Sequence, residues 1–297
     1  MATDDLAYAI RTTLSGDSRK LPAAFAQSKI SVSDCAVEGD FIRVRGQLYV
    51  PGVADLRAHV IQHFHDVPLA GHPGREKTYD LVTRKYFWPG MYDDVRQYVR
   101  NCSTCQRAHS SLESYQGALR QLPVPSGAYR ELSMDHIVEL PPSRLDGCGC
   151  TYTIILTITD RLTKRKHFIP VANRDAVTTA DAVLQHVIKD QGMFEVMTTD
   201  RAPEFMSAFT KRLEERMGIK HRFSTAFHPQ TDGQSERSNQ ILEVYLRSFV
   251  NYLQTDWAQW LCMAEFAANN VKNGATGISP FYATLGRNPR MEVNSTP

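Results

Sequence analysis

The sequence predicts two kinds of domain in one chain, a small helical domain followed by a larger α/β domain. In the part from 51 to 110, apolar residues recur at helical spacing. From about residue 129, strand patterns alternate with helix patterns, which is typical of a sheet covered by helices. The segment 111–128 carries Ser, Gly and Pro without periodicity and therefore indicates a linker.

Each helix expected in the first domain presents one apolar stripe. Residues 1–50 are expected to form an N-terminal extension, whose clearest signal is a short strand in FIRVRGQLYV. The helical stripes that follow comprise Leu56, Val60 and Phe64, then Thr78, Leu81 and Val82, and then Met91, Val95, Tyr98 and Val99.

The composition is that of an ordinary globular protein. The chain has 297 residues, 42% of them hydrophobic and 22% charged, which is enough for two or three domains. No apolar run is long enough to cross a bilayer, and the acidic start lacks the pattern of a signal peptide. We therefore expect an intracellular protein without a membrane partner, in which the six cysteines are thiols or metal ligands. The net charge of +2 requires any basic surface for nucleic acid to be local.

Two histidines and two cysteines of the helical domain form a candidate metal site. His65 and His72 precede Cys102 and Cys105, which stand in the sequence CSTC. Two imidazoles and two thiolates are a tetrahedral set for Zn²⁺, and four protein ligands leave no position for water. The sequence therefore predicts a structural zinc ion that stabilises a segment with little apolar core.

Other assignments of these residues stay open at this stage. The CxxC pair is also a redox motif, although a redox pair is expected between a strand and a helix rather than after a helix. His63 competes with His65 as a ligand because it is two residues away, and His59 and His109 are further candidates.

The second domain is expected to contain strands and helices in alternation. Asp135 lies in the strand pattern ELSMDHIVELP, and Asp200 ends the short strand FEVMTTD. The other expected elements are a buried strand in TYTIILTITD, its hairpin partner KHFIPV, a helix in DAVLQHVIKDQG that ends at Gly192, a helix in EFMSAFTKRLEERMG and a strand in IKHRFST.

The polar stretch FHPQTDGQSERSNQ leads into a last long helix, expected from about 233 to 254. Asp232 directly precedes this helix and is interpreted as its N-cap. Glu236 stands one turn later on a polar face with Gln240, Glu243 and Arg247, so we interpret Glu236 as the functional acid. The buried stripe of the helix is expected to comprise Leu242, Tyr245, Leu246, Phe249 and Leu253.

The acids Asp135, Asp200 and Glu236, with 35 residues between the last two, resemble the catalytic triad of the integrases of Gypsy-type LTR retrotransposons and, more distantly, of retroviruses. The upstream histidines and cysteines fit the same family. The resemblance covers roughly residues 40–288 and extends to the motifs GHPGREKTYDLVTRKYFWPGMYDDVRQYVRNCSTCQ, TDRLTKRKHFIPV, HPQTDGQSERSNQILE and AEFAANN...TGISPF.

This resemblance implies a ribonuclease-H-like catalytic core at 129–290, with a mixed five-stranded sheet flanked by helices, preceded by a small all-α zinc-binding domain. It implies 3′-end processing and strand transfer of element DNA into target DNA, with Asp135, Asp200 and Glu236 binding two Mg²⁺ or Mn²⁺ ions. Carboxylates are hard oxygen donors that suit these ions, and two ions can serve the attacking and the leaving oxygen. It further implies a dimer or tetramer, a chromatin protein as a further partner, and a nuclear location after cytoplasmic particle assembly.

The expected DNA contacts lie near the third acid and in the hairpin. They are Phe227, Gln230, Asn239, Gln240 and Lys164. A ring at 227 that packs under the loop and a solvated hairpin around RLTKRKHF are the structural alternatives. Asp160 and Glu204 are interpreted as structural acids rather than as triad members.

The chain departs from the family at several positions. Ala202 and Glu204 stand where the family usually has Gly and Gln, His136 stands where Phe is common, and the linker lacks a usual Trp. Residues 291–297 are expected to be a tail without the family's usual C-terminal DNA- or chromatin-binding domain. The alternatives to integrase are a domesticated DNA- or protein-binding protein and a hydrolytic nuclease of the same fold.

Overall fold

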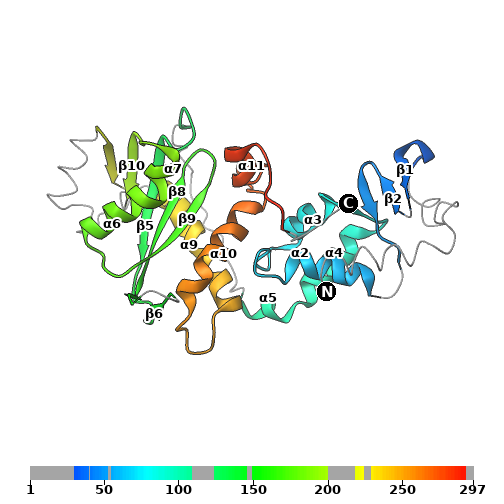
Figure 1. Ribbon diagram of the computed structural model, residues 1–297, viewed down its shortest axis with the longest axis horizontal. Coiled ribbons are helices and arrows are strands. Elements are labelled where there is room, and N and C mark those ends of the chain that lie inside the picture. Colours follow the sequence, from blue (N-terminus) through cyan, green and yellow to red (C-terminus); the bar gives the residue numbers. More distant parts are fainter. Residues whose placement is uncertain are drawn as a thin grey trace. The chain divides into compact units, whose positions relative to one another are not determined.

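Two compact units divide the chain (Figure 1). The first comprises Met1–Arg107 together with Pro289–Pro297, and the second comprises Ala108–Asn288. None of the described helices is long and apolar enough to cross a membrane. The computed structural model describes residues 30–39, 41–52, 55–108, 124–145, 149–199, 218–223 and 229–291, with the backbone alone for 32, 223 and 229–236.

A four-stranded sheet forms part of the first unit. After a short 3₁₀ turn, η2 (Val32–Asp34), its strands are β1 (Cys35–Glu38), β2 (Phe41–Val44), β3 (Gln47–Tyr49) and β4 (Tyr86–Phe87). The first three are antiparallel neighbours, and β3 pairs in parallel with β4 through Leu48 and Tyr86. The domain boundary predicted at residue 50 needs correction because it divides this sheet. A two-residue strand such as β4 has no periodicity that a sequence pattern can detect.

Four helices complete the described part of the first unit, and they bury most of the predicted stripes, although Tyr98 and Val99 of the third stripe are half-buried. Leu56, Val60 and Phe64 are buried on the first helix, as are Leu81 and Val82 on the second. The helices are α2 (Leu56–His65), α3 (Arg75–Thr83), α4 (Met91–Asn101) and α5 (Ser103–Ala108). Gly90, with φ of 80°, is left-handed directly before α4, a conformation in which a side chain would be strained.

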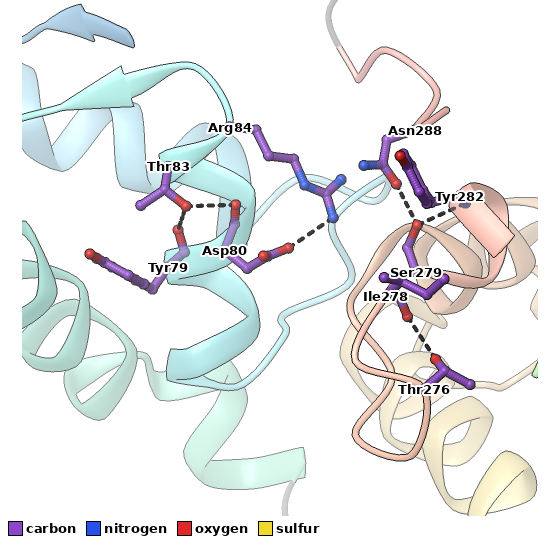
Figure 2. A network of polar contacts seen from close by, with 9 residues as sticks. All are labelled: Tyr79, Asp80, Thr83, Arg84, Thr276, Ile278, Ser279, Tyr282 and Asn288. Atoms are coloured by element: carbon purple, nitrogen blue, oxygen red, sulfur yellow. Dashed lines mark hydrogen bonds and ion pairs between the residues drawn. The ribbon is translucent and has the colours of Figure 1, made fainter. Parts of the chain in front are cut away.

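Side chains at the helix ends satisfy main-chain carbonyls and amides (Figure 2). At the end of α3, Thr83 Oγ1 donates to the Tyr79 and Asp80 carbonyls at 2.9 and 3.0 Å, and Arg84 pairs with the Asp80 carboxylate at 2.9 Å. In the second unit, Ser279 caps α11 (Pro280–Leu285) by accepting a 3.0 Å hydrogen bond from the Tyr282 amide. The Ser279 contact is an N-cap that satisfies one of the free amides at the start of α11.

A mixed five-stranded sheet forms the centre of the second unit. Its strand order is β11-β10-β5-β8-β9. The strands β5, β8 and β9 are antiparallel neighbours, whereas β10 and β11 run parallel to β5. The strands are β5 (Glu131–Ile137), β8 (Ile154–Asp160), β9 (Lys166–Val171), β10 (Val196–Thr199) and β11 (Lys220–Phe223). This order and direction confirm the predicted ribonuclease-H-like core, including the hairpin of β8 and β9.

The remaining elements of this unit flank the sheet or connect its strands. A short ribbon, β6 (Ser143–Arg144) with β7 (Thr151–Tyr152), lies apart from the main sheet. The helix predicted before Gly192 is present, but it contains a π-helical turn. It comprises α6 (Ala176–Val183), the π segment η3 (Leu184–Ile188) and α7 (Lys189–Gln191). Residues 204–217, which carry the predicted helix EFMSAFTKRLEERM, lie outside the described residues.

Two cores lie on opposite faces of the sheet because successive strand residues point to opposite sides. Leu156 and Ile158 of β8 pack in one core with Val183 and Val187 of the helix before Gly192. Ile155, which directly precedes Leu156, packs in the other core against α9 (Pro229–Phe249) and α10 (Trp257–Asn270). Asp135 pairs directly with Thr157, so it belongs to the face that α9 covers.

The helix α9 differs from its prediction at both ends. It begins at Pro229, so Asp232 lies within its first turns and the N-cap assignment is wrong. Proline suits a first helical turn because its fixed φ is helical and its missing N–H needs no partner there. The helix ends at Phe249, which leaves Leu253 72% exposed rather than in the buried stripe. Leu242 and Tyr245 are buried as predicted.

Candidate functional site

Four side chains of the first unit meet in a cluster of potential metal ligands. One ligand atom each from His65, His72, Cys102 and Cys105 lies within 4.8 Å of all the others. His65 ends α2, and Cys102 stands between α4 and α5. His65, His72 and Cys105 are buried, and Cys102 is half-buried. The predicted quartet is therefore assembled from three separate segments.

The separations within the cluster fit a tetrahedral zinc ion. Cys105 Sγ is 3.3 Å from His65 Nε2 and 3.8 Å from His72 Nδ1, and Cys102 Sγ is 3.4 Å from His72 Nδ1. Bonds of about 2.0–2.3 Å from a tetrahedral Zn²⁺ place its ligands about 3.3–3.8 Å apart. The donor set and its spacing thus fit the ion that the sequence predicts.

A strained loop brings His72 back to His65. Gly71 and His72 both have left-handed backbones, with φ of 74° and 48°. The His72 amide donates a 3.0 Å hydrogen bond to the His65 carbonyl, which closes the loop between the two histidines. A left-handed non-glycine residue costs roughly 1 kcal/mol or more, so it persists where the surroundings impose it, as at binding sites.

A buried threonine determines which nitrogen of His65 faces the cysteines. Thr78 Oγ1 donates to the Pro73 carbonyl at 3.0 Å and lies 3.2 Å from His65 Nδ1. Because its single proton is used on Pro73, the hydroxyl accepts from His65, and Nδ1 carries the proton. The lone pair of His65 is then on Nε2, the atom that faces Cys105. Such outer contacts orient metal-bound histidines.

Burial makes the cluster favourable for a cation. Burial raises the pKa of Cys105 to about 12, with the neighbouring Cys102 as a smaller cause. Burial also lowers the pKa of His72, so its imidazole is neutral and able to donate a lone pair to a metal. A bound divalent cation reverses the effect on the thiols, since it favours the thiolate.

The other histidines considered as zinc ligands are either away from the cluster or outside the described residues. The ring of His63 packs edge-on against Phe64 at 5.2 Å and is not in the cluster. His59 is exposed on α2, and His109 lies outside the described residues. The cluster therefore contains His65 rather than its rivals.

In the second unit, Asp135 is half-buried in the middle of the central strand β5 and is held by two donors. The His136 amide donates to its Oδ1 at 2.8 Å, and Asn239 Nδ2 donates to its Oδ2 at 2.8 Å. Asn239 comes from α9, so this bond ties the helix to the strand. These two hydrogen bonds orient the carboxylate.

The other two acids of the predicted triad cannot be placed with the same detail. Thr199 ends β10, the parallel neighbour of β5, and Asp200 directly after it lies outside the described residues. Glu236 belongs to α9, three residues before Asn239, with its backbone alone described.

The predicted DNA contacts have varied surroundings. Gln240 is exposed on α9. Lys164 is half-buried in the β8–β9 turn, where its Nζ donates to the Arg161 carbonyl at 2.6 Å, and burial lowers its pKa. Asn239 is engaged with Asp135. Phe227 lies outside the described residues, and Gln230 is in the first turn of α9 with its backbone alone described, so all these contacts stay predictions.

Asp160, interpreted from the sequence as a structural acid, is fully buried in the hairpin. It accepts hydrogen bonds from the amides of Tyr129 and Thr163 at 3.0 and 2.9 Å, and from the Thr163 hydroxyl at 2.6 Å. These bonds close the turn between β8 and β9 and use the carboxylate internally.

Comparisons with known proteins show what the two parts of the chain are similar to. Residues 53–111 match the family model of the integrase zinc binding domain. The chain is 28% identical, over 99% of its length, to the Transposon Tf2-3 polyprotein and to the Transposon Tf2-4 polyprotein of Schizosaccharomyces pombe (strain 972 / ATCC 24843). It spans 22% of the length of these polyproteins. These findings confirm the resemblance to retrotransposon integrases.

Solved retroviral structures are similar to part of the chain. The catalytic core domain of BIV integrase is 17% identical, with a TM-score of 0.40 over 53% of this chain and 95% of that one. The HTLV-2 integrase catalytic core domain, solved in complex with magnesium in a trimeric form, is 18% identical, with a TM-score of 0.39 over 52% of this chain and 95% of that one.

Sequence reasoning missed the threonines that support both sites. Thr78 supports His65, and Thr157 on β8 contacts Asn239. A signal was present for the second, since Thr157 and Thr159 alternate with isoleucine and leucine in a strand that is otherwise apolar. Two polar residues on one face of a buried strand indicate a polar partner on that face.

Proposed function

We propose that this protein is a retrotransposon integrase that carries out 3′-end processing of element DNA and its strand transfer into target DNA. The observation that carries this proposal is Asp135 at the centre of a ribonuclease-H-like sheet, with its carboxylate joined to α9 through Asn239. The Tf2 relatives, which are transposon polyproteins, support the same function.

The placement of the elements supports a triad of Asp135, Asp200 and Glu236. The strand β10, which ends one residue before Asp200, pairs directly with β5. The helix α9 carries Glu236 one turn before Asn239, the residue that touches Asp135. Three acids from two adjacent strands and one helix packed on them are therefore proposed to share one site.

Carboxylates at these positions suit Mg²⁺ or Mn²⁺, which bind through oxygen ligands. Two such ions, when bound, polarise the phosphodiester and stabilise the attacking and leaving oxygens. Asp135 is half-buried rather than fully enclosed. The hydrogen bonds from His136 and Asn239 fix the orientation of its carboxylate before any ligand arrives.

The first unit is proposed to serve this reaction through binding rather than chemistry. Its zinc cluster has four protein ligands and no open position, so its role is structural. Element DNA ends, target DNA and further copies of the chain are the proposed partners, because joining two ends requires more than one active site. A chromatin protein as a further partner, and a nuclear location, follow from the same proposal.

Strand transfer with oligonucleotides that mimic element ends tests the proposal. Asp135→Asn, Asp200→Asn and Glu236→Gln each keep the side-chain shape but remove the charge that holds divalent ions, so each should reduce strand transfer to background. Glu243→Gln is the matched control, because Glu243 is exposed on the same helix, two turns from Glu236, and pairs with Arg247 at 3.2 Å. It should retain activity.

The outcomes separate this proposal from its alternatives. Cleavage of DNA ends without joining, abolished by the same three changes, would indicate a hydrolytic nuclease. DNA binding with no divalent-ion-dependent reaction would indicate a domesticated binding protein. Asp232→Asn tests the competing acid: an inactive Asp232→Asn with an active Glu236→Gln would reassign the third member of the triad.

A further inference from the structure

Two hydroxyl contacts fasten β8 to α9 beside Asp135. Thr157 Oγ1 is 3.1 Å from Asn239 Oδ1, and Thr159 Oγ1 is 3.1 Å from Ser238 Oγ. Thr157, Thr159 and Ser238 are 2%, 4% and 2% exposed. Buried hydroxyls are costly without partners, so these contacts specify how α9 lies against the strand.

Hydrogen bonds connect Thr157 through the Asn239 amide to the Asp135 carboxylate. The Asp135 carboxylate only accepts hydrogen bonds, so the Asn239 atom that faces its Oδ2 at 2.8 Å is the amide nitrogen. The amide oxygen therefore faces Thr157, whose hydroxyl donates to it. A second acceptor, the Asp135 carbonyl, lies 3.3 Å from the same hydroxyl. The Thr157 hydroxyl has one proton, and the shorter of its two contacts is the one to the Asn239 amide oxygen.

We propose that Thr157 is a positioning residue for the metal-binding acid, acting through the Asn239 amide. The Thr157 hydroxyl holds the amide oxygen, so the amide nitrogen stays directed at Asp135 Oδ2. Without that hydroxyl, the amide oxygen has lost this donor, and the amide nitrogen is held less firmly against Asp135 Oδ2. The inference deepens the proposed function and rests on it, since it assumes that Asp135 binds the divalent ion.

Thr159 provides a matched comparison on the same strand and the same face. Its contact with Ser238 also joins β8 to α9, whereas the Asp135 carboxylate is held by the His136 amide and by Asn239. Loss of either hydroxyl loosens the same helix by one hydrogen bond. Only the loss of the Thr157 hydroxyl removes a hydrogen bond to the amide that holds Asp135. The two variants therefore separate positioning of Asp135 from general stability.

Mn²⁺ binding by the zinc-loaded full chain, measured without DNA by electron paramagnetic resonance, tests the inference. Asp135→Asn identifies the binding that belongs to the acid site. Thr157→Val should weaken that binding about 10-fold, the lower end of the usual loss when a supporting contact of a metal ligand is removed. Thr157→Ser should restore it, and Thr159→Val should leave it unchanged. Asn239→Ala repeats the test from the helix side, where alanine is well tolerated.

Each result is decisive. Unchanged affinity in Thr157→Val and Asn239→Ala overturns the positioning role while the proposed function stands. Equal weakening in Thr157→Val and Thr159→Val also overturns it, because general loosening of the helix then explains the effect. Equal Mn²⁺ binding by Asp135→Asn and the unchanged chain would mean that the acid site binds no metal, which overturns the proposed function as well.

Discussion

The zinc-ligand cluster and the site around Asp135 orient their side chains in contrasting surroundings. In the first unit, four ligand atoms lie within 4.8 Å of one another, and three of the four residues are buried. In the second unit, Asp135 is half-buried and lies on a sheet face that a helix covers in part. A closed set of nitrogen and sulfur donors suits a structural ion, whereas an accessible carboxylate suits an ion that must meet a substrate.

Each site nevertheless has its own buried threonine, and the two threonines play opposite hydrogen-bonding roles. Thr78 accepts a hydrogen bond from His65, which places the lone pair on the other ring nitrogen. Thr157 donates a hydrogen bond to the Asn239 amide oxygen, so the amide nitrogen faces Asp135. A hydroxyl can do either, because it has one donor and two acceptor positions. The difference between the sites therefore lies in their metal ligands and exposure rather than in the kind of residue that supports them.

Removal of zinc should produce the largest effect and should be confined to the first unit. Structural zinc contributes on the order of 10 kcal/mol of apparent binding free energy in small domains, so chelation should unfold the helices that carry the ligands. Limited proteolysis followed by mass spectrometry should show new cleavage within residues 55–108 while the five-stranded sheet stays protected. A first unit that resists the protease after verified zinc loss would contradict the structural role.

Leu242→Ala should act in the opposite unit and independently of zinc. Leu242 is fully buried between α9 and the sheet, in the core that contains Ile155 and Trp257. The cavity should lower the free energy of unfolding by about 2–5 kcal/mol. Urea unfolding should show this loss in the second unit alone, with zinc stoichiometry unchanged. Leu253→Ala is the control, because Leu253 is largely exposed and should change stability little.

Acid should destabilise the second unit through His221. Burial lowers the pKa of His221 to about 4, below its ordinary value of 6.5. The unfolded chain then binds more protons than the folded one between these two values, so stability is full above pH 6.5 and falls as the pH approaches 4. The loss is on the order of 1–3 kcal/mol, reduced by partial solvent screening.

The measurement is the free energy of unfolding of the unchanged chain and of His221→Gln at pH 7 and pH 4.5. Glutamine retains a polar group near Thr199 Oγ1, which lies 2.7 Å from His221 Nε2, but it does not titrate. The variant should lose less stability on acidification, and zinc release affects both chains alike. Parallel pH dependence in the two chains would exclude His221 as the titrating group.

Thr78→Val should have the smallest effect and should sharpen the comparison of the two threonines. Loss of the acceptor for His65 Nδ1 should weaken zinc binding about 10-fold without removing a ligand. Competition with a chelator should detect this change, and Thr78→Ser should bind zinc like the unchanged chain. Equal zinc affinity in Thr78→Val would show that the cluster orients His65 without help, unlike the arrangement proposed for Asp135.

The sequence by itself determined the parts of this protein that depend on local pattern and chemical type. Period-two alternation places Asp135 on one face of a strand, and helical spacing identifies the stripes around Val60 and Leu242. The residue types His, His, Cys and Cys indicate zinc because few other ions prefer that set. The motif around Glu236 and those around the histidines and cysteines resemble the family before any geometry is known.

Only the tertiary structure decided which groups meet. His63 competes with His65 in the sequence pattern, but the structure places His65 rather than His63 beside Cys105. The loop through Gly71 then brings His72 back to His65. The pairing of β3 with β4 joins residues far apart in the chain by main-chain bonds that leave no side-chain signature. The direction of the Asn239 amide depends likewise on Thr157 from another element. Such choices follow from packing across long sequence separations, which local periodicity does not encode.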